Sequence, residues 1–344
     1  MADIAPEPAE PEPGGGVTPA STPGGKPGET LVAGRRLWSD LAAAVGRAVI
    51  GGAETVRLIT IALLADGHVL VEDVPGTGKT LLARAIARAL ALDTARIQGT
   101  PDLLPSDVTG ASLFEPGGLR FVGGPVFTNV LLVDEINRAT PRTQSALLEA
   151  MQEHQVSVEG VTRPLPDPFV VLATQNPVEF EGTFALPQAQ LDRFLLRARV
   201  GYPDDEAERR IARRHQAAVD PLDTIEPVID RERLLAVRDR VRTIRVADEV
   251  EAYLVALVRA TREHPDIDLG ASPRATVALY RASQAAAVLE GREFVTPDDV
   301  KGIATAVLGH RLIVDLDRTL HGATADTVLA AILASVAVPP VIAD

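Results

Sequence analysis

A short loop that contains glycines, a lysine and a threonine, EDVPGTGKT at 72–80, offers the clearest chemistry in the sequence. It follows the apolar run HVLVED at 68–73 and precedes LLARAIARAL, so the spacing predicts a strand, a tight loop and a helix. Backbone N–H groups at the start of such a helix bind phosphate. In this arrangement Lys79 reaches the β- and γ-phosphate oxygens of a nucleotide, and the Thr80 hydroxyl holds Mg²⁺. Asp73 stands where the general phosphate-loop pattern begins with glycine. The predicted nucleotide-binding residues of this loop are Pro75, Gly76, Thr77, Gly78, Lys79, Thr80 and Leu81.

Polar residues end two further apolar runs. In NVLLVDEIN at 129–137, Asp134 and Glu135 follow four apolar residues. Beside a phosphate loop, we expect Asp134 to lie next to Mg²⁺, through water, and Glu135 to polarise the attacking water as a general base. Asn176 in TQNP again follows an apolar run, and it is placed to hold the attacking water or the γ-phosphate. An asparagine that only opens a turn before proline is the alternative interpretation.

The pattern between about residues 38 and 200 alternates helical segments with short apolar runs. Such runs, with little polar alternation, predict a parallel sheet that is covered on both faces. The five expected strands are 68–73, 94–99, 130–135, 169–176 and 193–200. Two stretches around glycine turns, 111–124 and 155–165, predict β-hairpins instead.

Shifts in composition along the chain predict the domain boundaries. Residues 1–30 are rich in proline, glycine and acidic residues and poor in large aliphatic ones, so we expect a disordered tail. An α/β domain follows at 31–202, and its first helix is expected to begin near Ser39 or Asp40. Residues 203–344 form the last predicted domain, which is helical. Its expected helices are 204–218, 231–243, 247–262, 273–290, 297–309 and 323–337.

Composition excludes several classes of site. The 344 residues include no cysteine, which excludes disulfides, thiolate zinc sites and iron–sulfur clusters. The six histidines show no metal-binding spacing, and the formal net charge of −13 disfavours nucleic acid as a partner. No run of eighteen apolar residues is present, and the first residues lack the features of a secretory signal. We therefore expect a cytoplasmic protein.

Longer motifs point to a family. LLVDEINRATPRTQSALLEAMQE and ATQNPVEFEGTFALPQAQLDRFLLR, together with the phosphate loop and GASPRA at 270–275, closely resemble the MoxR family of AAA+ ATPases. The resemblance covers about residues 38–320 and is most specific at 130–197. It implies an α/β core with a five-stranded parallel sheet and β-hairpin insertions, followed by a smaller all-α lid domain.

The resemblance also assigns roles to residues. Arg193, in LDRF, matches the arginine finger that completes the site of a neighbouring subunit, and Arg274, in SPRA, matches the sensor 2 arginine of the lid. Asn176 matches sensor 1, and the two hairpins match insertions that face the central channel in similar proteins. The residues expected to pack against adenine are Val49, Ile50 and Gly51.

The implied function is Mg²⁺-dependent ATP hydrolysis in a ring, expected to contain six subunits, with chaperone-like remodelling of a client protein. The family often works beside proteins with a von Willebrand A domain, which this chain lacks. A nucleotide-dependent assembly switch with little turnover is one alternative. A nucleic-acid motor is another, but the predicted hairpin tips carry Glu115 and Glu159 rather than lysines, which disfavours contacts with phosphates.

Overall fold

A parallel five-stranded sheet forms the centre of the α/β part of the chain. The computed structural model describes residues 27–72, 77–116, 118–176, 182–214 and 220–340. The strand order is β2-β5-β8-β1-β9, and every pair in this sheet is parallel, as predicted. The strands are β1 (Val69–Glu72), β2 (Thr94–Gln98), β5 (Val130–Asp134), β8 (Val170–Gln175) and β9 (Leu196–Ala198).

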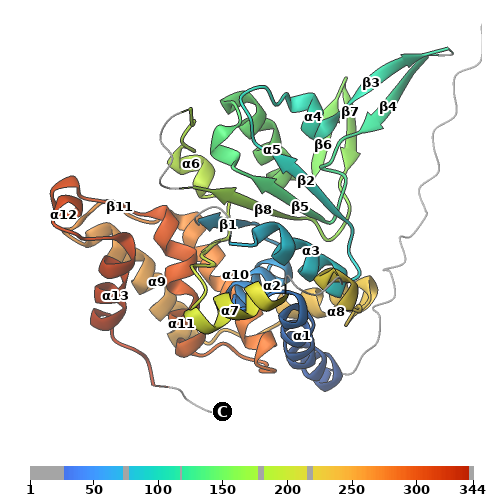
Figure 1. The fold of residues 1–344 in the computed structure, drawn as a ribbon. Helices are drawn as coiled ribbons and strands as arrows, with labels where there is room; N and C mark the ends of the chain where they lie inside the picture. Colours follow the sequence, from blue (N-terminus) through green and yellow to red (C-terminus); the bar gives the residue numbers. More distant parts are fainter. Residues whose placement is uncertain (1–26, 73–76, 117, 177–181, 215–219, 341–344) are drawn as a thin grey trace, which may run out of the picture.

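Helices cover both faces of the sheet. Since successive side chains of a strand point to opposite faces, neighbouring residues of one strand pack into different layers of the core. Val69 and Val71 belong to one core cluster, whose helices include α1 (Pro27–Ala48), α2 (Ala53–Leu64) and α3 (Lys79–Ala89). Leu70 belongs to a second cluster on the other face, with residues of α5 (Pro141–Glu153). Both layers are visible in Figure 1. The buried apolar runs of the sequence thus form the two-sided core expected of a parallel sheet.

Two antiparallel hairpins extend this core, at the positions that the sequence predicts. One is β3 (Gly110–Glu115) with β4 (Gly118–Gly123), and the other is β6 (Gln155–Val158) with β7 (Val161–Pro164). In Figure 1 the β3–β4 hairpin projects away from the sheet. The ring of Phe121, in β4, packs against the ring of Phe127. The guanidinium of Arg163 lies over the Phe121 ring, 3.8 Å from its centroid.

The C-terminal part is helical, as expected, apart from one short pair of strands. β10 (Ile267–Leu269) and β11 (Ile313–Val314) pair antiparallel, so the lid is not purely α. They join two loops whose strand-forming residues are too few to predict from sequence. The helices of this region are α7 (Asp205–Arg214), α8 (Arg231–Val241), α9 (Asp248–Glu263), α10 (Pro273–Leu289), α11 (Pro297–Leu308), α12 (Leu316–Leu320) and α13 (Ala325–Ser335).

The first helix begins earlier than the sequence predicts. α1 starts at Pro27, inside the segment 1–30 that we expected to be disordered, and it packs against α10 of the lid. Ser39 is an interior residue of this helix: its hydroxyl donates to the carbonyl of Arg36 at 2.9 Å instead of capping a helix start. The remainder of the predicted tail, residues 1–26, lies outside the described residues. Within the described part of the chain, no helix combines the length and apolarity needed to cross a membrane.

Ion pairs join the lid to the sheet. Arg197 of β9 binds Glu72 of β1 at 3.1 Å and Asp326 of α13 at 2.5 Å, and its side chain is only 10% exposed. Arg238 of α8 makes two hydrogen bonds to Asp167, at 2.5 and 2.7 Å, which hold the pKa of that carboxyl below its usual value. Paired, half-buried charges of this kind restrict how the lid can move against the sheet.

Candidate functional site

The predicted phosphate loop leads into α3 as expected. Gly78 is the residue before this helix and has φ 80°, a left-handed conformation that glycine adopts without strain. Lys79 and Thr80 form the first turn of α3, where N–H groups without helical partners point outward. A cavity of about 450 Å³ opens here and is lined by Thr77, Gly78, Lys79, Thr80 and Leu81. Pro75 and Gly76 lie outside the described residues.

The two carboxylates and the amide converge on the same cavity. Asp134 is the last residue of β5, Glu135 follows it, and Asn176 follows β8, so all three lie at the carboxyl edge of the sheet and line the cavity beside Lys79. The Thr80 hydroxyl donates to Asp134 Oδ2 at 3.5 Å. A hydroxyl and a carboxylate oxygen are hard ligands of the kind that Mg²⁺ selects, so this pair fits the predicted metal site.

Several polar residues that sequence reasoning missed contact Asp134 and Glu135, among them Arg138, whose Nη1 donates to Glu135 Oε2 at 3.3 Å. Arg96 Nε donates to Asp134 Oδ2 at 2.7 Å, and Gln98 Nε2 donates to Glu135 Oε2 at 3.1 Å. The backbone N–H of Glu135 donates to the Thr174 hydroxyl at 2.9 Å. Arg96 and Gln98 alternate along β2, a polar pattern at a strand's carboxyl end that could have marked them. Only the pairing of β2 with β5 shows which residues they contact.

A larger cavity, of about 710 Å³, adjoins the phosphate cavity and also contains the residues predicted to bind adenine. Val49, Ile50 and Gly51 line it, and Thr77, Gly78 and Leu81 line both cavities. Most of the remaining lining residues lie near the boundary between the two predicted domains, in α7, or after it in the sequence. They are Val200, Gly201, Tyr202, Pro203, Asp204, Ala207, Ile211, Arg214, Asp220 and Pro221.

Arg193 and Arg274 lie together but away from the phosphate loop. Both line a cavity of about 290 Å³ with Met151, Gln152 and Asp192, and neither lines the phosphate cavity or the adenine-side cavity. The Nε atom of Arg193 is buried without a hydrogen-bond partner among the described residues. The structure therefore brings the two predicted arginines to each other and not to the Lys79 site of the same chain.

Comparisons with known proteins identify the family of the chain. The model of the ATPase family associated with various cellular activities (AAA) matches residues 68–196, and the AAA lid domain matches residues 259–332. YeaC of Bacillus subtilis is 46% identical over 297 residues, 86% of this chain and 92% of that protein. Chaperone MoxR1 of Mycobacterium tuberculosis is 40% identical over 308 residues, 86% of this chain and 81% of the relative. The chain belongs to the MoxR family of AAA+ ATPases.

A solved structure extends the comparison to three dimensions. A candidate ATPase from Cytophaga hutchinsonii matches this MoxR-family chain with a TM-score of 0.85 and 36% sequence identity, covering 91% of this chain and 98% of that chain. The match therefore includes both the sheet and the helical lid.

The buried His68 of this MoxR-family chain serves packing. No group of three or more His, Cys, Asp or Glu residues in the described ranges is arranged to hold a metal ion. His68 is buried against His154 and Phe169; its Nε2 contacts the carbonyl of Met151 at 2.9 Å, and Nδ1 accepts from Val171 N–H at 3.1 Å. Burial lowers the pKa of His68 to about 4. A neutral imidazole that both accepts and donates explains this arrangement without a metal.

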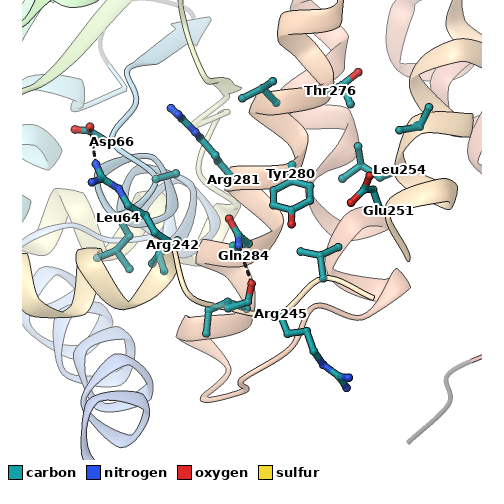
Figure 2. A pocket seen from close by; sticks show the side chains of 16 residues that line it. Leu64, Asp66, Arg242, Arg245, Glu251, Leu254, Thr276, Tyr280, Arg281 and Gln284 are labelled. Atoms are coloured by element: carbon teal, nitrogen blue, oxygen red, sulfur yellow. Dashed lines mark hydrogen bonds and ion pairs between the residues drawn. The ribbon is translucent and has the colours of Figure 1, made fainter. Parts of the chain in front are cut away.

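A separate cleft of about 570 Å³ lies between the end of α2 and helices α8, α9 and α10 (Figure 2). Two of its polar contacts are an ion pair between Arg242 and Asp66 at 3.5 Å and a hydrogen bond that Gln284 donates to the carbonyl of Ile244 at 2.7 Å. Burial and the charge of Glu251 raise the pKa of Tyr280. None of the predicted site residues lines this cleft.

Proposed function

We propose that this MoxR-family chain hydrolyses ATP at sites shared between neighbouring subunits of a ring. The separation of Arg193 and Arg274 from the phosphate cavity carries this proposal. Phosphoryl transfer spreads negative charge over the γ-phosphate oxygens, which a guanidinium, always charged, binds in a bidentate manner. Arg96, which does line the phosphate cavity, is paired with Asp134. A second copy of the chain that presents Arg193 and Arg274 to this cavity would supply the positive charge that the γ-phosphate needs.

Within one subunit, each residue of the phosphate cavity has a distinct task. Lys79 binds the β- and γ-phosphate oxygens, and the backbone N–H groups at the start of α3 donate hydrogen bonds to the phosphates. Glu135 takes the proton of the attacking water, and Asn176 orients that water. Thr80 and Asp134, the latter through water, would hold Mg²⁺, which neutralises charge on the phosphates when it is bound.

The family and the exposed hairpin residues support a proposal for the work that ATP hydrolysis drives. A relative at 40% identity is named a chaperone, and we propose client remodelling for this chain, in a ring of six and with a von Willebrand A-domain protein as a candidate partner. Phe114 is 86% exposed and Leu119 is 68% exposed, and the two residues lie opposite each other on the β3–β4 hairpin. An exposed apolar pair of this kind suits contact with an unfolded polypeptide.

Nucleic acid fits this hairpin less well. Glu115, beside the tip, pairs with Arg120 at 2.9 Å, so the basic side chain nearest the tip is already neutralised. A contact with phosphates needs free positive charge. The remaining alternative is an assembly switch with little turnover, and steady-state hydrolysis at saturating ATP separates it from a motor.

Mixed rings test the proposal. Arg193→Ala subunits are expected to bind ATP but to lose turnover, because the guanidinium removed from each subunit acts at the site of its neighbour. Glu135→Gln subunits cannot hydrolyse ATP but still carry Arg193. Adding them to Arg193→Ala subunits should therefore restore part of the turnover. If mixtures show no recovery, Arg193 does not act between subunits and the proposal is wrong.

A further inference from the structure

Arg311 directs its guanidinium at the two residues that flank Arg193. It ends the short helix η3 (Gly309–Arg311) in the lid, and only 3% of its side chain is exposed. Its Nε donates to Asp192 Oδ1 at 2.7 Å, and its Nη2 donates to the carbonyls of Asp192 at 3.3 Å and of Phe194 at 2.7 Å. Its Nη1 donates to the carbonyls of Leu195, at 3.0 Å, and of Val307. A buried guanidinium whose donors all have partners fixes the backbone that it binds.

Ser272 connects the same carboxylate to the helix that carries Arg274. It is the residue before α10, and its hydroxyl accepts from the N–H of Arg274 at 3.2 Å. The hydroxyl also donates to Asp192 Oδ2 at 2.8 Å. Asp192 thus gives one oxygen to Arg311 and the other to Ser272. Hydrogen bonds link the neighbour of Arg193 in the core to the backbone of Arg274 in the lid.

We propose that Asp192, Ser272 and Arg311 form a clamp that holds Arg193 and Arg274 at a set spacing, so that they act as one unit. The inference rests on the proposed function, in which both arginines reach a neighbour's nucleotide. The three residues are positioning residues. Because Arg193 belongs to the core and Arg274 to the lid, any motion between these parts would separate the guanidinium groups. Misplacing a group that binds the transition state by about 1 Å can cost about a hundredfold in rate.

Substitutions at Ser272 distinguish an effect on the placement of Arg193 and Arg274 from an effect on the stability of the lid. Ser272→Ala removes the hydrogen bond to Asp192 together with the helix cap. Ser272→Thr keeps a hydroxyl in place and is the conservative variant. Thr324→Ala is a matched control, because Thr324 caps α13 in the same lid, accepts from Thr327 N–H and does not contact Asp192. Arg311→Lys is a second variant: it keeps the charge but loses the planar fork of donors.

The experiment measures ATP turnover in homogeneous and mixed assemblies of the full chain, with the affinity for a fluorescent ADP analogue measured in parallel. We expect Ser272→Ala and Arg311→Lys to lower turnover by about tenfold or more at saturating ATP with little change in nucleotide affinity. Ser272→Thr and Thr324→Ala should stay close to the unmodified protein. Added Glu135→Gln subunits, whose clamp is intact, should restore part of the turnover at the Ser272→Ala subunits' own sites.

Other outcomes overturn the clamp. It is wrong if Ser272→Ala keeps full turnover, if Thr324→Ala loses as much, or if Glu135→Gln subunits give no recovery although they rescue Arg193→Ala. The Arg193→Ala variant in the same assay identifies which idea has failed. If Arg193→Ala loses turnover and Ser272→Ala does not, the clamp alone is wrong. If Arg193→Ala itself keeps full turnover, the proposed function fails and the clamp fails with it.

Discussion

Gly99 and Glu135 approach each other so closely that a side chain on Gly99 has no room. A Cβ built on Gly99 would lie 2.2 Å from the carbonyl oxygen of Glu135. The N–H of Gly99 donates to the carbonyl of Asp134 at 2.7 Å. Glu135 has φ 55°, which is uncommon for a residue other than glycine. The residue after β2 therefore helps to hold the backbone conformation of the predicted general base.

Gly99→Ala should displace Glu135 and lower ATP turnover by about tenfold or more, because a base must lie within hydrogen-bond reach of the proton that it takes. Steady-state phosphate release measures the effect. Gly302→Ala is the matched control, since a Cβ on Gly302 meets no atom within 4 Å. In the interior of α11 it should raise the free energy of unfolding by about 0.5–1 kcal/mol. Normal turnover in Gly99→Ala would show that this contact does not position the base.

Glu135→Gln should bind ATP and hydrolyse it about a hundredfold more slowly or worse, because general base catalysis is lost while the shape of the side chain is kept. Equilibrium binding of a fluorescent ATP analogue and phosphate release separate these two properties. Lys79→Ala serves as a contrast, since we expect it to lose nucleotide binding itself. Turnover near that of the unmodified protein would remove Glu135 from its assigned role.

The buried imidazole of His68 should make the protein less stable in acid. Its pKa is about 4 in the folded chain against 6.5 in the unfolded chain, so between these values the unfolded state binds more protons. The ionisation of His68 by itself should lower the free energy of unfolding by about 3 kcal/mol as the pH drops from above 6.5 to below 4. His68→Gln can still donate toward Met151 but cannot ionise in this range. Urea titrations from pH 7.5 to 4 should show a shallower pH dependence in this variant, and an equal slope would contradict the assignment.

Phe114→Ser should weaken binding of an unfolded polypeptide and leave basal ATP turnover unchanged, since Phe114 lies on a projecting hairpin away from the phosphate cavity. Fluorescence anisotropy with carboxymethylated, permanently unfolded α-lactalbumin measures the binding. Leu320→Ser is the control: this side chain is 76% exposed, but it lies on α12 in the lid. Equal losses in both variants would point to general surface apolarity and not to the hairpin.

Much of the fold could be predicted because its signals are local. The five apolar runs became the five strands of one parallel sheet, and both glycine-turn segments became hairpins. The start of α1 was wrong, because Ser39 and Asp40 suggested a cap that packing against α10 overrides. The pair β10–β11 was also missed, since strands of two or three residues carry almost no periodicity.

The sequence by itself determined the chemistry available: Lys79 and Thr80 at a helix start, Asp134 and Glu135 after one strand, and Asn176 after another. These groups converge because parallel strands end at the same edge of a sheet, which the alternating pattern already implied. Only the tertiary structure decided that Arg96 and Gln98 hold the carboxylates, and that Arg274 lies with Arg193. Strand order and lid position depend on contacts between distant parts of the chain, and such contacts leave no local pattern in the sequence.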